Sequence, residues 1–250
     1  MKTEIKEDNI FKYPDTNSSR AKIEYINRKF ENQKIAIIGM GGTGSYILDQ
    51  IAKTPVKEIH IFDGDIFQLH NAFRSPGAIS TQELEAEIEL KKVNYYYRLY
   101  SKMHNRIVPH ENYVTSQNIH ELNGFNYVFI SVDKNEARYN ITQALLSMGV
   151  TFIDVGLGVN KVDDSLIGTI RVTVGTNSMN SHLDSRIGSH EFEENEYANN
   201  IQIADLNCMN AILAVIKWKK LTGFYQDIKH EHNTLFFINT NKILNENNPA

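Results

Sequence analysis

Cysteine is almost absent from this 250-residue sequence, which contains only Cys208. One thiol cannot form an internal disulfide framework or a zinc site of four cysteines. No run of about 18 apolar residues occurs, and residues 1–20 lack a secretory apolar segment, so we expect neither a transmembrane helix nor a membrane partner. The net charge of −4 argues against a general nucleic-acid-binding protein. These absences together favour a cytoplasmic location.

What the sequence does contain is a glycine-rich stretch between Lys34 and Arg74. The apolar run 35–38 predicts a buried parallel strand, residues 45–52 a helix, and residues 58–62 a second strand that ends at Asp63. Three glycines between the first strand and the helix have G-x-G-x-x-G spacing: Gly39, Gly41 and Gly44. Such a loop brings a phosphate to a helix N-terminus, and an acid in the position of Asp63 can bind ribose hydroxyls. The stretch therefore predicts nucleotide binding.

The rest of the chain predicts an α/β fold with a Rossmann-like parallel sheet flanked by helices. Further strands are expected at 106–108, 127–132 and 151–155, separated by a long helix over 80–103 and a helix over 135–148. Residues 1–19 are expected to be a flexible N-terminal arm, and residues 20–250 a single domain. Its last part is predicted to contain a strand, a polar loop, a helix and a hairpin, at 166–174, 176–200, 201–221 and 234–244. The hairpin would form a small antiparallel C-terminal β addition.

Charged and polar side chains gather where the predicted strands end. Asp65, Asn71 and Arg74 follow Asp63, and Asp133 follows the strand at 127–132. Ligands bind at this edge of open α/β sheets. Arg74 and a lysine of the next helix, either Lys91 or Lys92, could contact phosphates, and Asp133 could hold Mg²⁺. This set suits a nucleoside triphosphate better than a dinucleotide.

These residues resemble the motifs of the ThiF/MoeB/HesA-like adenylyltransferases, which share a fold with E1 ubiquitin-activating enzymes. The family's G-x-G-G-x-G loop is matched by residues 39–44, including Gly42. Its D-x-D-x(5)-N-x-x-R block is matched by Asp63, Asp65, Asn71 and Arg74. Lys92 fits the following lysine best, and Asp133 with Arg138 fits the D-N-x(3)-R segment. The resemblance covers roughly residues 20–225.

The resemblance implies a ThiF-type adenylation domain over residues 20–250, with a crossover-like loop at 176–200. It implies ATP-dependent activation of the C-terminal carboxylate of a ubiquitin-like or sulfur-carrier protein, as an acyl-adenylate. By carry-over the glycine loop, Asp63, Asp65, Asn71, Arg74 and Lys92 bind ATP, Arg74, Lys92 and Asp133 are catalytic, and Asp133 holds Mg²⁺. A homodimer is expected, in which Arg20 could reach the partner's site, although a solvated arginine is the simpler reading of that residue.

The sequence departs from the family in its cysteines. The C-x-x-C pairs of many relatives are missing, so no zinc is expected, and the loop at 176–200 offers no cysteine for a thioester. Cys208 lies in an apolar helix and is better explained as a core thiol than as a nucleophile. Three alternatives remain: a tRNA-modifying ThiF-like dehydratase, an NAD-binding oxidoreductase, and a non-catalytic E1-like partner subunit.

Overall fold

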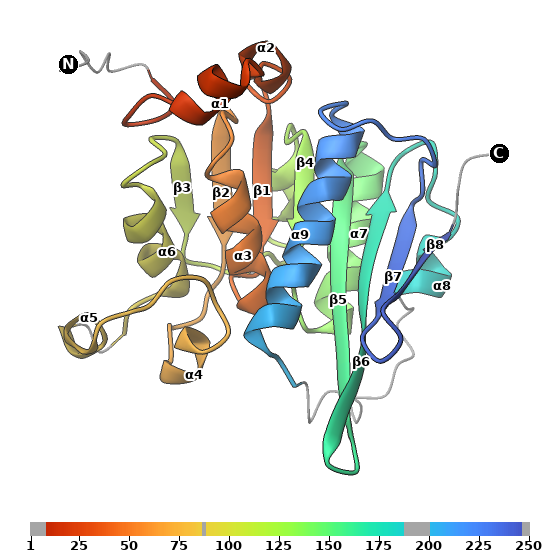
Figure 1. Cartoon of the computed structure of the whole chain (residues 1–250). Coiled ribbons are helices and arrows are strands. Elements are labelled where there is room, and N and C mark those ends of the chain that lie inside the picture. Colours follow the sequence, from red (N-terminus) through yellow and green to blue (C-terminus); the bar gives the residue numbers. More distant parts are fainter. Residues whose placement is uncertain (1–8, 87–88, 188–200, 247–250) are drawn as a thin grey trace.

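One twisted sheet, covered by helices on both faces, forms the body of the protein (Figure 1). The computed structural model describes residues 9–86, 89–187 and 201–246. In these residues eight strands follow the spatial order β3-β2-β1-β4-β5-β6-β7-β8. Neighbours from β3 to β5 run parallel, whereas β5 to β8 pair antiparallel. The Rossmann-like parallel sheet and the antiparallel C-terminal addition are therefore confirmed.

The strands are β1 (Lys34–Ile38), β2 (Glu58–Phe62), β3 (Ile107–His110), β4 (Tyr127–Ile130), β5 (Thr151–Val162), β6 (Ser165–Gly175), β7 (Asn233–Phe237) and β8 (Lys242–Glu246). The longer helices are α3 (Gly42–Ile51), α6 (Lys92–Tyr100), α7 (Asn135–Met148) and α9 (Ala204–Leu221). The short ones are α1 (Thr16–Ala21), α2 (Glu24–Asn27), α4 (Leu69–Ala72), α5 (Thr81–Ala86), α8 (Leu183–Ile187) and the 3-10 turn η1 (Ile119–Leu122). Within the described residues, no helix is long and apolar enough to cross a membrane.

The central strand β1 is apolar on both faces because helices cover both. Ile35 and Ile37 pack into a core with α3, α6 and α9, while Ala36 and Ile38 pack into a second core with α7 and η1. Figure 1 shows α3 and α9 in front of the sheet and α7 behind it. Burial on both faces explains why the strand appears in the sequence as an unbroken apolar run.

The long helix predicted over 80–103 is wrong, because the chain forms two helices, α5 and α6, with an extended segment before α6. Ser80 and Glu83 form a capping box at the start of α5. The segment before α6 pairs with the loop after β2: Phe67 N donates to Leu90 O at 2.6 Å, and Lys92 N donates to Asp65 O at 3.0 Å. This pairing replaces helical hydrogen bonds and fixes the first residue of α6 beside Asp65.

Strand β5 is longer than predicted and forms a hairpin with β6. β5 was expected to end near Val155 but continues to Val162, and its outer half pairs with β6 alone. Figure 1 shows this hairpin projecting beyond the carboxyl ends of the parallel strands. The projecting hairpin supplies a side wall next to the ends of β1 and β4, where ligands bind in this class of sheet.

Two predicted irregular segments contain regular structure. The expected arm over 1–19 is corrected for residues 9–19, since Phe11 forms an antiparallel bridge with His104 and α1 begins at Thr16. Residues 1–8 lie outside the described residues. The loop expected over 176–200 contains α8, and its last part, 188–200, lies outside the described residues.

His104 makes the stability of the fold depend on pH. Its ring is fully buried, and burial lowers its pKa from 6.5 to about 4. The folded state therefore binds this proton more weakly than the unfolded chain. The contribution of His104 to the free energy of unfolding is fully present above pH 6.5. It decreases by about 3 kcal/mol as the pH falls from 6.5 towards 4. Urea unfolding should show a larger loss for the wild type than for His104→Gln over this range, and equal losses would contradict the assignment.

Candidate active site

The glycine loop lies where the chain leaves β1 and β4 in opposite directions, which is the usual ligand site of such sheets. Gly39 has φ +89°, and a Cβ there would lie 2.4 Å from the carbonyl oxygen of Ser131. A Cβ on Gly44 would lie 1.9 Å from Gly39 O. Both glycines are therefore required by close backbone packing, and that packing places the N-terminus of α3 at the edge of the sheet.

Asp63 is a buried anchor for this loop. Its Oδ2 accepts from Met40 N at 2.7 Å, and its Oδ1 accepts from Asp65 N at 2.8 Å. The side chain is 6% exposed. Each carboxylate oxygen can accept a second hydrogen bond, so the residue can hold the loop and still meet a ribose hydroxyl.

Lys92, rather than Lys91, faces this acid pair. Its ammonium lies 2.6 Å from Asp65 Oδ2 and 3.8 Å from Asp63 Oδ2, whereas Lys91 donates to the carbonyl of Gly64. Burial alone would raise the pKa of Asp65, but hydrogen bonds from Lys92 and Tyr113 outweigh it and hold that pKa below its usual range. The hydrogen bond that Tyr113 donates to Asp65 also raises the pKa of Tyr113 to about 12. Lys92 is thus a buried, charge-compensated cation beside the glycine loop.

Arg74 and Asp133 lie within electrostatic reach of one another. Burial lowers the pKa of Arg74, and the charges of Tyr96 and Asp133 oppose this effect. Arg74 Nε is buried and has no hydrogen-bond partner among the described residues, while Asp133 is exposed. Burial lowers the pKa of His70, and the positive charges of Arg74 and Lys92 lower it further. The basic residues of the predicted set therefore share one neighbourhood.

Asn71 has a structural task that the sequence did not reveal. Its Oδ1 accepts from Gln68 N at 2.8 Å, which completes the capping box of α4. Its Nδ2 is buried without a partner in the described part of the chain. Asn71 thereby fixes the short helix that carries the chain to Arg74.

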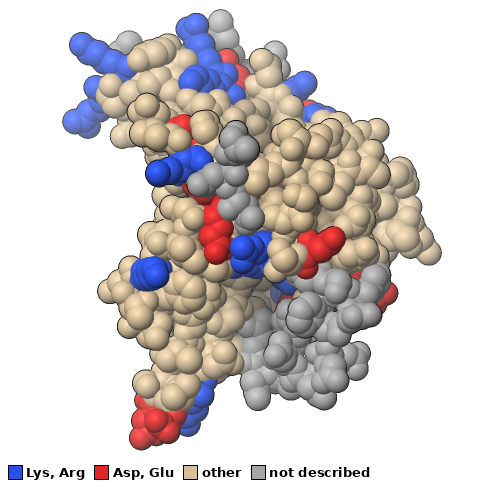
Figure 2. Space-filling view, turned by 90° about the vertical axis from the view of Figure 1, so that its right-hand side faces the viewer, with Lys and Arg blue, Asp and Glu red and all other residues tan. Residues whose placement is uncertain are grey.

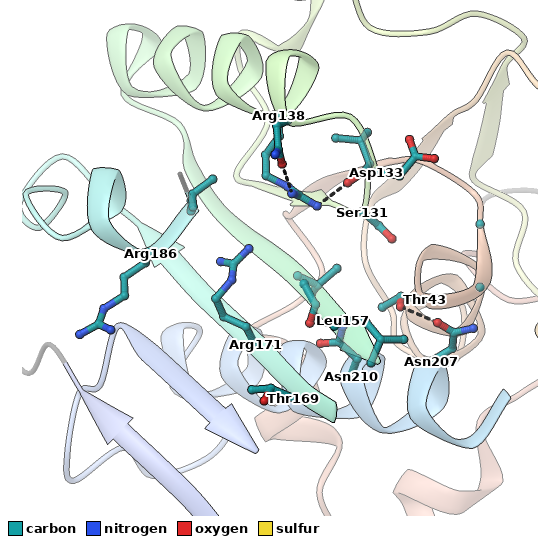
Figure 3. A pocket seen from close by; sticks show the side chains of 18 of the residues that line it. Thr43, Ser131, Asp133, Arg138, Leu157, Thr169, Arg171, Arg186, Asn207 and Asn210 are labelled. Atoms are coloured by element: carbon teal, nitrogen blue, oxygen red, sulfur yellow. Dashed lines mark hydrogen bonds between the residues drawn. The ribbon is translucent and has the colours of Figure 1, made fainter. Parts of the chain in front are cut away.

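A cavity of about 580 Å³ opens beside the glycine loop (Figure 3). Its walls come from the start of α3, the end of β4, the β5–β6 hairpin, α8 and α9. Of the residues that the sequence motifs singled out, Gly41, Gly42, Asp133 and Arg138 line it, whereas Asp63, Arg74 and Lys92 are not among its lining residues. The predicted set thus divides into a lining group and a group around α4 and α6.

A buried ion-pair triad supports the cavity wall. Asp154 is fully buried, and its two oxygens lie 3.0 Å from Arg138 Nε and 2.6 Å from Arg171 Nη2. Arg138 also donates to the carbonyl of Val132. Two guanidinium groups share one carboxylate, so the triad connects α7, β5 and β6. Sequence reasoning considered Arg138 but missed Asp154 and Arg171.

Asn207 is a further residue that the sequence motifs missed. Its side chain is 1% exposed and connects two segments of the site: Oδ1 accepts from Thr43 Oγ1 at 3.1 Å, and Nδ2 donates to Arg74 O at 3.2 Å. A Cβ on Gly42 would lie 2.0 Å from Asn207 Nδ2, so this glycine makes room for the amide. The contacts hold the glycine loop and the chain at Arg74 in a fixed relation.

We expect Asn207→Leu to lower the free energy of unfolding by about 1–3 kcal/mol, because the Arg74 carbonyl loses its amide donor. Urea denaturation measures this loss. Asn207→Asp keeps the acceptor for Thr43 but places a carboxylate oxygen against the Arg74 carbonyl in a buried position, so it should cost at least as much. Ile212→Ala, on the exposed side of the same helix, is the control. A loss no larger than that of the control would contradict the role of Asn207.

Arg20 and Cys208 are both placed away from a catalytic arrangement. Arg20 is exposed on α1, at the opposite end of the sheet from the start of α3 (Figure 1). Any contribution of Arg20 would therefore need a second copy of the chain. Cys208 lies half-buried in α9, and burial raises the pKa of its thiol. A raised pKa reduces the thiolate fraction and disfavours a nucleophilic role.

Asp133 does not belong to a cluster of metal-binding side chains within the described residues. No group of three or more His, Cys, Asp or Glu side chains suited to a metal occurs in residues 9–86, 89–187 and 201–246. Mg²⁺ is often held by one or two carboxylates plus substrate phosphates. An exposed carboxylate at the mouth of a nucleotide loop fits a metal that arrives with its nucleotide.

Comparison with known proteins gives a consistent picture. Residues 19–243 match the model of the ThiF family. The adenylyltransferase and sulfurtransferase UBA4 of Saccharomyces cerevisiae is 25% identical over 138 residues, which are 52% of this chain and 29% of UBA4. The match thus spans less than a third of that relative's length.

Two solved structures of E. coli MccB resemble the whole fold. MccB with ATP gives a TM-score of 0.72 at 17% identity, covering 95% of this chain and 73% of that one. MccB with MccA-N7isoASN gives 0.73 at 16% identity, covering 95% and 74%. PaaA gives 0.69 at 15% identity, covering 98% and 77%. At these identities the similarity establishes the arrangement of helices and strands only.

Proposed function

The chain belongs to the ThiF family, and from this premise we propose that it is an ATP-dependent adenylyltransferase acting on a carboxylate. The observation that carries the proposal is the set of contacts that connects the glycine loop with Lys92 and with the chain at Arg74. Asp63 anchors the glycine loop and lies 3.8 Å from the buried cation Lys92, and Asn207 connects Thr43 of the loop to the carbonyl of Arg74. The similarity to UBA4 and the fold shared with MccB, which has been solved with ATP, support it.

In the proposed reaction a carboxylate oxygen of the substrate attacks the α-phosphorus of ATP. The bond from that phosphorus to the bridging oxygen breaks, pyrophosphate leaves with the bond electrons, and an acyl-adenylate forms. Negative charge develops on the phosphate oxygens, so fixed N–H donors and cations stabilise the transition state. The N-terminus of α3 provides backbone donors, and Arg74 provides a guanidinium fork.

The acidic residues have separate tasks in this proposal. Asp63 would bind the ribose, and Asp65 would hold Lys92 in place until a phosphate accepts one of its remaining donors. Asp133 would hold Mg²⁺, which supplies charge neutralisation for the phosphates when bound. Asn71 would act through the position of Arg74.

The substrate is proposed to be the C-terminal carboxylate of a ubiquitin-like or sulfur-carrier protein, and the active form a cytoplasmic homodimer. UBA4 is named as a sulfurtransferase as well as an adenylyltransferase, and MccB has been solved with MccA. These names support a second substrate besides ATP, which we propose to carry the reacting carboxylate. No cysteine thioester on this chain is proposed, because the pKa of Cys208 is raised by burial.

ATP–pyrophosphate exchange tests the proposal. The purified full chain should incorporate labelled pyrophosphate into ATP only when a small protein with a free C-terminal carboxylate is present. Amidation of that carboxylate is the control and should abolish exchange. Hydride exchange with a nicotinamide cofactor, and no exchange of pyrophosphate with any carboxylate, would overturn the proposal.

A further inference from the structure

Positive charge gathers at the end of the sheet opposite the glycine loop. This end is formed by the segments that lead into β1, β2 and β3, residues 9–33, 52–57 and 101–106, and we call it the amino-end surface. These segments contain nine Lys and Arg but three Asp and Glu, although the whole chain has a net charge of −4. All nine basic residues are exposed. Figure 2 shows blue atoms gathered at the end of the molecule that carries α1 and α2 in Figure 1, with few red atoms among them.

Backbone contacts join the three segments into one surface. Lys12 N donates to Met103 O at 2.9 Å, which connects the first segment with the third. Lys57 N donates to Gln33 O at 2.9 Å, which connects the first segment with the second. The basic side chains are therefore carried by one connected backbone rather than by independent loops, and their charges add up over the whole surface.

Several of these cations lack a partner carboxylate. Lys53 lies 2.7 Å from Asp49, whereas Lys12, Lys22 and Lys57 form no ion pair with a described residue. Unpaired like charges on one surface produce a positive potential that attracts a polyanion. The acidic balance of the whole chain excludes a generally basic protein, but it does not describe the charge that a partner meets at this end.

Two exposed tyrosines lie among the cations. Tyr13 is 51% exposed and Tyr25 is 71% exposed, and no other large hydrophobic side chain is exposed in these described segments. Tyr25 belongs to α2, which stands between the exposed residues Lys22 and Lys29. Aromatic rings among cations suit single-stranded nucleic acid, because unpaired bases stack on the rings while the cations hold the phosphates. A membrane surface would require more apolar side chains to insert.

We propose that the amino-end surface binds single-stranded nucleic acid without sequence preference. Lys12, Lys22 and Lys57 contact phosphates, and Tyr25 stacks on a base. RNA and DNA both offer these groups, so both fit the surface. Because Asp63 and the glycine loop lie at the carboxyl ends of the same parallel strands, the nucleic acid is a partner held away from the candidate active site.

Fluorescence anisotropy with the full chain, without ATP, tests the proposal. The probes are labelled single strands of DNA and of RNA, about 12 nucleotides long. Both should bind, with a Kd on the order of 10⁻⁶–10⁻⁴ M near physiological salt. If about four phosphates are contacted, the affinity should fall about 50-fold between about 50 and 200 mM salt. A duplex of the same sequence should bind less tightly, because its bases are not free to stack.

Two kinds of variant separate charge from stacking. The triple variant Lys12→Ala, Lys22→Ala and Lys57→Ala should reduce the slope of log affinity against log salt by about 2. Tyr25→Ala should weaken binding at least about fivefold and leave that slope unchanged, because stacking releases no counterions. Lys161→Ala, at an exposed lysine of β5, is the matched control and should bind like the wild type. Thermal melting checks that each variant folds.

Absence of binding at about 50 mM salt would overturn the proposal, as would equal binding by the wild type and the triple variant. Tighter binding of the duplex, of a polyglutamate peptide or of phosphatidylserine vesicles would assign the surface to another partner and would also overturn it. The measurement requires no adenylation, so its result does not depend on whether the chain catalyses ATP–pyrophosphate exchange.

Discussion

Arg74→Ala should reduce ATP–pyrophosphate exchange by about 10²–10³-fold, the loss observed when one preorganised donor is removed from a transition state. The expected cause is the missing guanidinium fork on the phosphates. Folding should be nearly unaffected, since Arg74 Nε has no hydrogen-bond partner among the described residues and Asn207 contacts the backbone carbonyl instead. The measurement is initial exchange rate at saturating ATP, alongside urea unfolding.

Arg74→Lys is the matched control for charge. It retains a cation but not the planar fork, so partial activity is expected, between those of wild type and Arg74→Ala. Arg28→Ala, a surface arginine near α2, controls for arginine removal in general. A normal exchange rate in Arg74→Ala would exclude this residue from the phosphate site, and a large loss of stability would show that it holds the fold instead.

The order of strands and the glycine loop could be predicted because they depend on local patterns. The residues of β1 and β4 are apolar on both faces, and Gly39 needs a positive φ that glycine adopts readily. The length of β5 could not be predicted, because Gly156 and Gly158 follow Val155 and glycine is unfavourable within strands. In the structure Gly156 remains extended and makes room for Arg171, its register partner on β6.

The acidic residues show the same limit for the site. Asp63 and Asp65 follow a strand with a recognisable spacing, so their proximity to the glycine loop could be predicted. Asp154 was overlooked although it lies within an apolar strand, where a charge needs partners. That signal could have identified it as part of a buried ion pair. The arginine partners of Asp154 are set by the pairing of β5 with β6 and by the packing of α7. The spacing of residues in the sequence predicts neither of these contacts.

The break in the predicted long helix also depends on tertiary contacts. Residues 80–103 have suitable helical spacing, but hydrogen bonds to the loop after β2 use the backbone before Lys92. The competing pairing places Lys92 next to Asp65 and explains why this lysine, rather than Lys91, faces the acid pair. Tertiary hydrogen bonds therefore outweigh local helix propensity next to Lys92, a residue that the proposed function requires.

Asp154→Asn should have the largest effect on stability, about 3–5 kcal/mol, since it leaves two guanidinium groups without their shared counter-charge in a buried position. The substitution keeps the size of the side chain, so a cavity cannot explain the loss. Urea unfolding monitored by the fluorescence of Trp218, which is fully buried, reports it. Asp184→Asn, an exposed acid of the same cavity, should change stability by no more than about 0.5 kcal/mol.

Asp154→Asn differs from Arg74→Ala in what else it changes. Without the carboxylate, Arg171 loses the partner that holds it beside Gly156, so the cavity wall should change together with stability. A double variant, Asp154→Leu with Arg171→Met, removes both charges of one pair and should recover part of the stability. If Asp154→Asn unfolded at the same urea concentration as Asp184→Asn, the triad would not stabilise the wall. The position of Arg171 would then need another cause.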